Sequence, residues 1–229
     1  MARLTFSLHP HINPDNGGVV IIGLGRFGRA MAEELIASGV EVLGIDNHEA
    51  TVQSMNGKLT QVVRADASDV ETLRQLGVDE FPNAVVAIGA DLAASILVAS
   101  ALLKLDGPEI WAKASTEQQG EILAQMGIKH IFHPEKDMGV RAAHLLTRSL
   151  SDYFDLGHGF AMATTVMPEK YTGVPLSQLA IRSRLGITII GVRDEEGNWL
   201  SAVADTVVRK GQTVLVAGPA KKLDAAFRQ

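Results

Sequence analysis

Short apolar runs alternate with amphipathic stretches from Val19 to about residue 150. A continuous apolar run is typical of a parallel strand buried on both faces, and apolar residues at every third or fourth position are typical of a helix. We predict a helix after each strand, two of them beginning at serines with capping-box spacing, Ser68 and Ser115. The predicted strands cover residues 19–22, 41–45, 61–64, 84–88, 109–113 and 128–132. This alternation predicts the α/β class with a doubly wound parallel sheet.

The pattern changes at the segment SDYFDLGHGF, residues 151–160, and becomes rich in strands beyond it. We predict a turn of hairpin type at residues 195–198. The other elements predicted here are strands over 160–167, 188–192 and 213–217, and helices over 174–184 and 221–227. We therefore predict a disordered lead-in over 1–16, a nucleotide-binding domain over 17–152 and a small α+β domain over 160–229.

Composition narrows the function classes. The chain has no cysteine, which excludes disulfides, thiolate metal sites and cysteine nucleophiles and agrees with a cytosolic setting. A net charge of −5 and a pI of about 5.8 argue against nucleic-acid binding. The longest apolar run falls short of a membrane span, and residues 1–16 lack the apolar middle of a signal peptide. We therefore expect a cytoplasmic protein that reaches a membrane only through another chain.

The strongest motif is VVIIGLGRFG, residues 19–28, in which Gly23, Gly25 and Gly28 form G-x-G-x-x-G between a strand and a helix. Such glycines allow a tight turn, close approach of a phosphate and close packing of helix on strand in a Rossmann-like fold. The helix N-terminus favours the phosphate charge. Asp46, at the end of the second strand, can accept hydrogen bonds from both ribose hydroxyls and would repel a 2′-phosphate. The alternative is that the glycines only make turns.

Arg26 lies inside the glycine motif, beside the predicted phosphate position. In ATP the space beyond it holds the γ-phosphate, whereas in a dinucleotide it holds a largely neutral nucleoside. A guanidinium there favours ATP through charge-assisted hydrogen bonds. The alternative is a solvated helix arginine. Asp66, just after the third strand, is placed either to contact an adenine edge or to stabilise a turn.

Several motifs occur together in a fixed order: VIIGLGRFG, GID, RADASD, VVAIGADLAASILVA, WAKAS, HPEKDMGVRAAHLL and GVPLSQLAIRSRLGITIIGVRDEEG. Over about residues 17–220 the chain resembles the RCK family (regulator of potassium conductance), and within it the cytosolic gating subunits of Ktr and Trk potassium transporters. The resemblance implies a Rossmann-like N-terminal domain followed by a small RCK C-terminal domain. It also implies homodimers that assemble into an octameric ring beneath a membrane potassium channel or transporter subunit. Members bind ATP and ADP, or NADH and NAD, and ring shape gates the pore.

The resemblance also assigns residues. The implied nucleotide site comprises Gly23, Gly25, Arg26, Phe27, Gly28, Asp46, Asp66, Ala67 and Lys113, and we add Asn47, Ile88 and Gly89 at the ends of the second and fourth strands. Glu135 matches an acidic residue that helps to hold a divalent cation, Mg²⁺ or Ca²⁺. A lone carboxylate would need phosphate oxygens or a symmetry mate to complete the shell. The alternatives are a surface lysine at Lys113 and a helix-dipole role for Glu135.

Some members of the family bind cyclic di-AMP in the C-terminal domain. Here Ile181, Ile187, Ile189 and Ile190 lie near Arg182 and Arg184 in sequence, although core packing with solvated arginines is the alternative. The segment Ser115–Gln119 departs from the pattern, because members often carry a histidine near this helix start.

Two other functions compete with a regulatory subunit. An NAD-dependent oxidoreductase would need a substrate domain with an acid–base pair, and residues 160–229 offer no evident one. A redox-sensing DNA-binding repressor would need a basic winged-helix segment, which neither terminus supplies. We therefore expect a nucleotide-sensing regulator that is neither an enzyme nor a nucleic-acid-binding protein, with an NAD(H)-reading regulator as the alternative.

Overall fold

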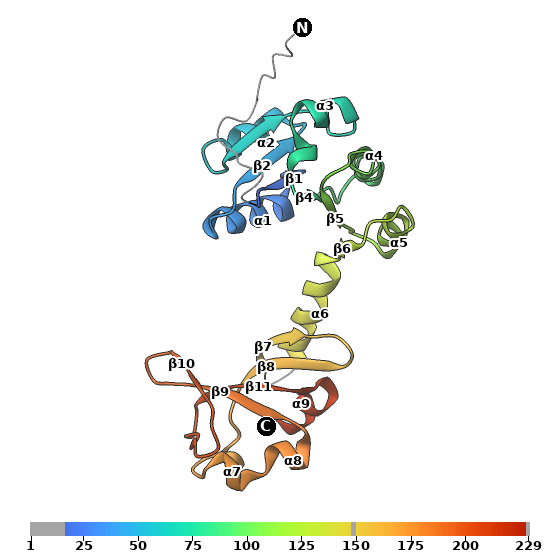
Figure 1. Ribbon diagram of the computed structural model, residues 1–229. Helices are drawn as coiled ribbons and strands as arrows, with labels where there is room; N and C mark the ends of the chain where they lie inside the picture. The colour runs from blue at the N-terminus through green and yellow to red at the C-terminus, as the bar shows by residue number, and fades with distance from the viewer. Residues whose placement is uncertain (1–16, 148–149, 228–229) are drawn as a thin grey trace. The chain divides into compact units, whose positions relative to one another are not determined.

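The computed structural model describes residues 17–147 and 150–227 and divides the chain into two compact units, Met1–Glu135 and Lys136–Gln229 (Figure 1). The predicted lead-in over residues 1–16 lies outside the described residues. The units meet at the start of helix α6 (Pro134–Thr147), earlier than the predicted boundary between 152 and 160. Arg141 of this helix donates from Nε to Asp152 Oδ1 (3.1 Å), which ties the later part of α6 to the second unit.

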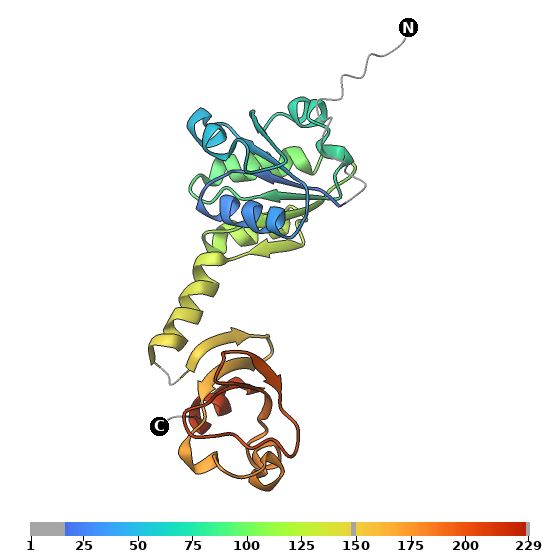
Figure 2. The ribbon, with the colours of Figure 1, turned by 90° about the vertical axis from the view of Figure 1, so that its left-hand side faces the viewer.

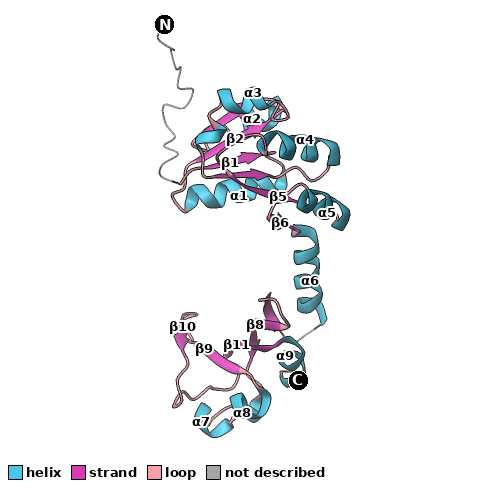
Figure 3. Cartoon of the chain, turned by 45° about the vertical axis from the view of Figure 1, so that its right-hand side comes forward, coloured by secondary structure: helices cyan, strands magenta, loops and turns pink. Residues whose placement is uncertain are grey.

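The first unit contains a six-stranded parallel sheet, and the predicted Rossmann-like class is confirmed (Figure 3). The strand order β3-β2-β1-β4-β5-β6 reverses between β1 and β4, as in a doubly wound fold. The strands are β1 (Val19–Ile22), β2 (Val42–Asp46), β3 (Gln61–Arg64), β4 (Asn83–Val86), β5 (Glu109–Lys113) and β6 (His130–Phe132).

Helices cover both faces of this sheet (Figure 2). Successive side chains of a strand point to opposite faces, so Val20 and Ile22 pack with α3, α4 and α5, whereas Ile21 packs with α1 and α2. The helices are α1 (Arg26–Ala37), α2 (Glu49–Met55), α3 (Val70–Gln75), α4 (Leu92–Leu102) and α5 (Glu117–Gln125), with a 3₁₀ turn at Val78–Glu80. This two-sided burial explains why β1 is a continuous apolar run.

Two helix starts differ from the predicted ones by one residue. The side chain of Asp69 caps α3 by accepting from the N–H groups of Glu71 and Thr72, and Thr116 Oγ1 caps α5 by accepting from the Gln119 N–H (3.1 Å). The Ser68 hydroxyl instead donates to Asp66 Oδ1 (2.7 Å), and the cap position belongs to Asp69. The predicted caps at Ser68 and Ser115 were therefore wrong by one position.

The second unit contains a five-stranded antiparallel sheet in the order β10-β9-β11-β8-β7. The predicted turn at 195–198 joins β9 to β10, while β7 and β10 themselves were not predicted. The predicted helix over 174–184 is broken at Ala180, which has a left-handed φ of +50°. The elements are β7 (Leu150–Asp155), β8 (Phe160–Val166), β9 (Thr188–Arg193), β10 (Trp199–Ser201), β11 (Thr213–Pro219), a 3₁₀ turn at Glu169–Tyr171, α7 (Leu176–Leu179), α8 (Ile181–Leu185) and α9 (Ala220–Ala226).

Each unit has its own core. In the second unit α9 packs Leu223 and Phe227 against Ala161 and Val216 of the sheet, and all four are almost fully buried. Among residues 17–147 and 150–227, no helix combines the length and the apolar character that crossing a membrane requires.

Gly28 holds α1 against β1 and provides a test of this packing. A Cβ on Gly28 would lie 2.0 Å from the Gly23 carbonyl oxygen, so we expect Gly28→Ala to lower the free energy of unfolding by about 3 kcal/mol. Urea denaturation at equilibrium measures this change. The matched control is Gly25→Ala, whose Cβ would meet no atom within 4 Å and should change stability by no more than about 1 kcal/mol. Equal stability of the two variants would contradict the packing role.

Candidate functional site

A cavity of about 1070 Å³ opens at the carboxyl ends of the parallel strands, around the point where the strand order reverses. This edge is where open α/β sheets hold their ligands. The residues predicted from the sequence gather here with one exception, Gly28, which is buried behind the turn. Those that line the cavity are Gly23, Gly25, Arg26, Phe27, Asp46, Asn47, Asp66, Ala67, Ile88, Gly89, Lys113 and Glu135.

The glycine turn forms one wall of the cavity. Gly23 has φ +94°, and a Cβ there would lie 2.9 Å from Ile88 Cγ1. Gly25 is exposed and is the N-cap of α1, with no side chain capping the helix. The backbone N–H groups at this helix start are therefore available to an anion, and the helix dipole favours negative charge there.

Asp46 joins the glycine turn to the next helix. Its side chain is only 10% exposed, and its Oδ2 accepts from the Leu24 N–H (2.8 Å). Its Oδ1 accepts from the His48 N–H (2.9 Å) and lies 3.2 Å from His48 Nδ1. These contacts fix the carboxylate in one orientation and leave lone pairs that sugar hydroxyls can use. Neighbouring Asn47 is held through its carbonyl, which accepts from Arg64 Nε (3.2 Å).

Asp66 lies at the end of β3, followed by buried Ala67. Its Oδ1 accepts from the Ser68 hydroxyl (2.7 Å) and the Ser68 N–H (2.9 Å), and these bonds hold the pKa of Asp66 below its usual value. Among the described residues Oδ2 has no donor, so it remains available to a ligand. Asp66 therefore stabilises a turn, and it can contact a ligand as well.

An ion pair lies on the part of the cavity wall that Lys113 and Glu135 form. Lys113 Nζ donates to Glu135 Oε1 (2.7 Å) and lies 5.7 Å from the centroid of the Phe27 ring. The Lys113 side chain is only 11% exposed, which excludes the surface-lysine alternative, whereas Glu135 is 57% exposed. The hydrogen bond from Lys113, with a smaller effect of the Arg26 charge, lowers the pKa of Glu135. Glu135 is therefore a carboxylate that already has a cationic partner.

Gly89 leaves space in the cavity beside Lys113 and Ser115, because it has no side chain. A Cβ there would lie 2.6 Å from Ser115 Oγ and 2.8 Å from Lys113 Nζ, so a larger residue would displace both groups. This is a second position, besides Gly23, where the absence of a side chain shapes the cavity.

The sequence analysis missed several residues of the cavity wall: Arg29, His48, Ser68, Asp91 and Ser115. Arg29 donates from Nε to the Leu24 carbonyl (2.7 Å), and Asp91 caps α4 by accepting from the Ala94 N–H (2.9 Å). The signal in the sequence for His48, Ser68, Asp91 and Ser115 is that each follows the end of a predicted parallel strand by two to four residues, whereas Arg29 lies within α1.

Glu135 does not have a complete cation site around it. Among the described residues no group of three or more His, Cys, Asp or Glu side chains is arranged to hold a metal ion. A carboxylate oxygen is the kind of ligand that Mg²⁺ and Ca²⁺ prefer. Glu135 therefore fits such a cation only together with oxygens from a bound ligand or another chain.

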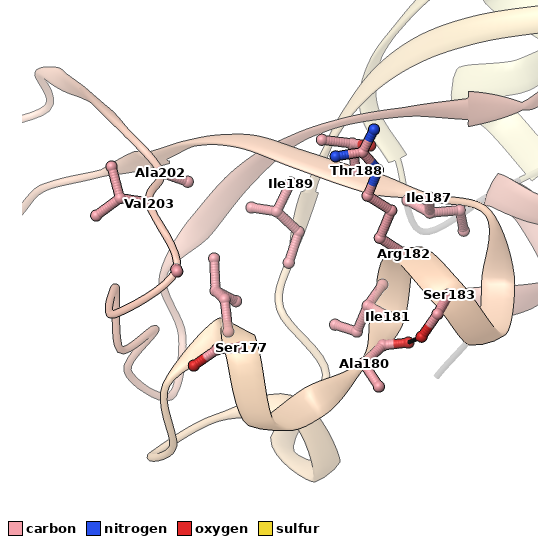
Figure 4. Close-up of a pocket in the computed structure, with 12 residues that line it drawn as sticks. Ser177, Ala180, Ile181, Arg182, Ser183, Ile187, Thr188, Ile189, Ala202 and Val203 are labelled. Carbon is pink, nitrogen blue, oxygen red and sulfur yellow. Dashed lines mark hydrogen bonds between the residues drawn. The ribbon is translucent and has the colours of Figure 1, made fainter.

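A second pocket, of about 660 Å³, lies in the second unit (Figure 4). Ile181, Ile187 and Ile189 line it with Arg182, whereas Ile190 and Arg184 do not. Ser177 and Ser183 add hydroxyl groups to a lining that is otherwise largely apolar. Of the six residues predicted here, four therefore come together.

Comparisons with known proteins agree with this architecture. The family model described as the TrkA-N domain matches residues 19–134. The Ktr system potassium uptake protein A of Vibrio alginolyticus is 34% identical over 204 residues, which cover 89% of this chain and 93% of that protein.

Solved structures agree in fold at lower identity. The crystal structure of the GsuK RCK domain superposes with a TM-score of 0.65 and 17% identity, over 95% of this chain and 48% of that chain. A structure of the GsuK channel bound to NAD gives a TM-score of 0.65 and 17% identity, over 93% of this chain and 39% of that chain. This chain thus spans less than half the length of the GsuK chains. The family match and the similarity to the Vibrio protein over nearly its whole length show that the chain belongs to the RCK family of TrkA-N-domain proteins.

Proposed function

We propose that this chain is a regulatory subunit of a potassium uptake system that senses ATP and ADP in its Rossmann-like unit. The observation that carries the proposal is the charged end of the cavity, where Arg26, Lys113 and Glu135 lie beyond the glycine turn. The similarity to a potassium uptake protein supplies the physiological setting. We expect no catalysis, because sensing needs only a difference in binding.

The distribution of charge favours an adenine nucleotide. Asp46 and Asp66 offer acceptors for sugar hydroxyls and an adenine amino group. Arg26 and Lys113 offer two cations at the other end, where ATP has its γ-phosphate. Charge-assisted hydrogen bonds are about twice as strong as neutral ones, so ATP gains more there than ADP.

A sensor needs two states that the nucleotides stabilise differently. A ligand shifts a conformational equilibrium only by its difference in affinity for the two states. One phosphate more or less provides that difference, and coupling is summed over all the sites of an assembly. We therefore propose a homodimer that assembles into an octameric ring, in which ATP favours the conducting shape of the pore partner and ADP the relaxed one.

The pore partner in this proposal is a membrane potassium channel or transporter subunit. The chain would then work in the cytoplasm and lie at the inner face of the membrane only through that subunit. The similarity to the Ktr protein A and the resemblance of the motifs to gating subunits support this arrangement.

An NAD(H)-binding regulator is the second candidate. The GsuK channel has been solved with NAD, and the cavity here is large enough for a dinucleotide. Asp46 would suit its adenosine ribose equally well. The cations at the far end favour ATP, since a nicotinamide nucleoside offers no equivalent anion. A small NAD-dependent oxidoreductase has less support, because residues 160–229 offer no evident acid–base pair for a substrate domain.

A divalent cation, Mg²⁺ or Ca²⁺, is part of the proposal. Glu135 would supply one carboxylate oxygen, and phosphate oxygens or a second chain would supply the others. The cation would neutralise phosphate charge and draw Glu135 away from Lys113.

Cyclic di-AMP is the proposed ligand of the second pocket. Arg182 can pair with a phosphate, and the isoleucine lining can pack against an adenine. One pocket offers one lining arginine for two phosphates, so a symmetric pair of copies would match the two-fold ligand.

Arg26→Ala tests the nucleotide preference. We expect the Kd of ATP to rise about tenfold and that of ADP to change by less than about twofold, because only ATP reaches the guanidinium with a γ-phosphate. Isothermal titration calorimetry with the full chain measures both constants, and titration with NAD and NADH tests the second candidate. The control is Arg74→Ala, a surface arginine outside the cavity.

Small-angle scattering of the same proteins extends this test to gating. Wild-type particles should differ in shape between ATP and ADP, and the difference should shrink in Arg26→Ala. Equal binding of ATP and ADP by the wild type, with superimposable scattering curves, would overturn the proposal. Tight NADH binding without ATP binding would favour the second candidate instead.

Glu135→Gln tests the cation. In the wild type we expect Mg²⁺ or Ca²⁺ to strengthen ATP binding, whereas in the variant the Kd should agree within about twofold with and without the cation. ATP alone should bind the variant at least as well as the wild type, because Lys113 is released. Glu121→Gln, an exposed residue of α5 outside the cavity, is the control. An undiminished cation effect in Glu135→Gln would contradict the role of this carboxylate.

Arg182→Ala tests the second pocket. Calorimetry should detect cyclic di-AMP binding to the wild type and an affinity at least about tenfold lower in the variant. Arg184→Ala, a neighbour that does not line the pocket, should bind as the wild type does. Absence of binding to the wild type, or equal losses in the two variants, would reject the ligand.

A further inference from the structure

Gln119 is a buried polar residue that the nucleotide proposal leaves without a role. It lies in the first turn of α5, is 2% exposed and is not part of the cavity wall. A buried amide must satisfy its hydrogen bonds within the protein, so its partners show what it holds in place.

The Gln119 amide connects two walls of the cavity. Its Oε1 accepts from the Ser115 N–H (2.9 Å), and its Nε2 donates to the Lys113 carbonyl (3.4 Å). Nε2 also donates to Ser95 Oγ (3.1 Å), which belongs to α4 and is fully buried. The first turn of α4 lines the cavity through Asp91 and Ala94. The amide thus fixes Lys113 and Ser115 relative to α4.

The hydrogen bond from the Ser115 N–H to Gln119 holds Ser115 at the cavity wall. Its hydroxyl is half-buried, lines the cavity and has no hydrogen-bond partner within the part of the chain that the structure describes. Ser115 Oγ and Lys113 Nζ both lie within 3 Å of the point that a Gly89 Cβ would occupy. The two groups therefore lie near each other beside Gly89, and a hydroxyl donor next to an ammonium group is a combination that a phosphate oxygen accepts.

We propose that Ser115 is a further ligand-binding residue, which donates to a phosphate of the bound nucleotide, and that Gln119 positions it together with Lys113. The proposal rests on the proposed nucleotide function and extends it to two residues. Ser115 contacts the ligand, whereas Gln119 acts only through Ser115 and Lys113. Both therefore affect the phosphate end of the ligand and leave the adenosine end unchanged.

The experiment compares ATP with adenosine in calorimetric titrations of the full chain. Ser115→Ala should weaken ATP binding about tenfold, the loss expected for one hydrogen bond to a charged group, and leave adenosine binding within about twofold. Gln119→Met, which keeps the length of the side chain but removes its hydrogen bonds, should weaken ATP at least as much and again spare adenosine. In the double variant the two losses should not add, because one residue acts through the other.

Ser38→Ala and Gln118→Met are the matched controls, since both residues are exposed and outside the cavity. Unchanged ATP binding in Ser115→Ala would overturn the proposal, and so would an equal loss of ATP and adenosine affinity in Gln119→Met. If Gln119→Met fails to fold, the ATP and adenosine affinities of Ser115→Ala still test whether Ser115 contacts the phosphate. Failure of the nucleotide function itself is distinguishable, because the wild type would then not bind ATP at all.

Discussion

The hydrogen bond from the Leu24 N–H to Asp46 Oδ2 (2.8 Å) is the contact on which the shape of the first unit's cavity depends. It joins the turn after β1 to the end of β2, and the turn reaches it only because Gly23 adopts φ +94°. Gly28 then lets α1 begin against the Gly23 carbonyl. With the turn and the helix start fixed in this way, Arg26 and Phe27 are presented to the cavity and the backbone N–H groups face its interior.

The charges along this cavity are arranged by end. Asp46 and Asp66 accept hydrogen bonds at one end, whereas Arg26 and Lys113 carry positive charge at the other. A ligand with hydroxyl and amino groups at one end and phosphates at the other matches this order. The base contributes similar contacts in every adenine nucleotide, so differences in affinity arise where the number of phosphates differs. This is why we expect the cavity to distinguish nucleotides by phosphate count.

The sequence predicted the parallel sheet well because its central strands β1, β2 and β4 are largely buried and need little context. Predicted and observed strands β1, β3 and β5 coincide, and the first residues after the strands form the cavity. By contrast, β7 and β10 are the two edges of the second sheet, where Phe154, Trp199 and Leu200 are exposed. The edge strand β3 was predicted because it falls within the regular alternation of strands and helices, whereas β7 and β10 lack that context and depend on their pairing partners.

The same reasoning separates the predicted from the missed parts of the site. Gly23, Arg26 and Asp46 line the cavity where motif spacing predicted a site, whereas the contact of Gln119 depends on Ser95 of α4, a helix that precedes it by a full strand. The burial of Lys113 also depends on tertiary structure, because the neighbouring sequence indicates only that this lysine lies at the end of a strand. Sequence spacing therefore locates the edge of the sheet, but it does not tell which polar groups there are buried.

The pair between Lys113 and Glu135 is unequal, and this inequality has consequences for ligand binding. Glu135 is 57% exposed, so water can solvate its carboxylate when the pair opens. Lys113 is 11% exposed and would remain in the cavity without a counter-charge, which costs more. In the proposed function, a phosphate that reached Lys113 would restore its counter-charge and leave the Glu135 carboxylate available to a cation. If one opening of the pair served both ligands, each would make the binding of the other more favourable, and by linkage the effect would be equal in the two directions.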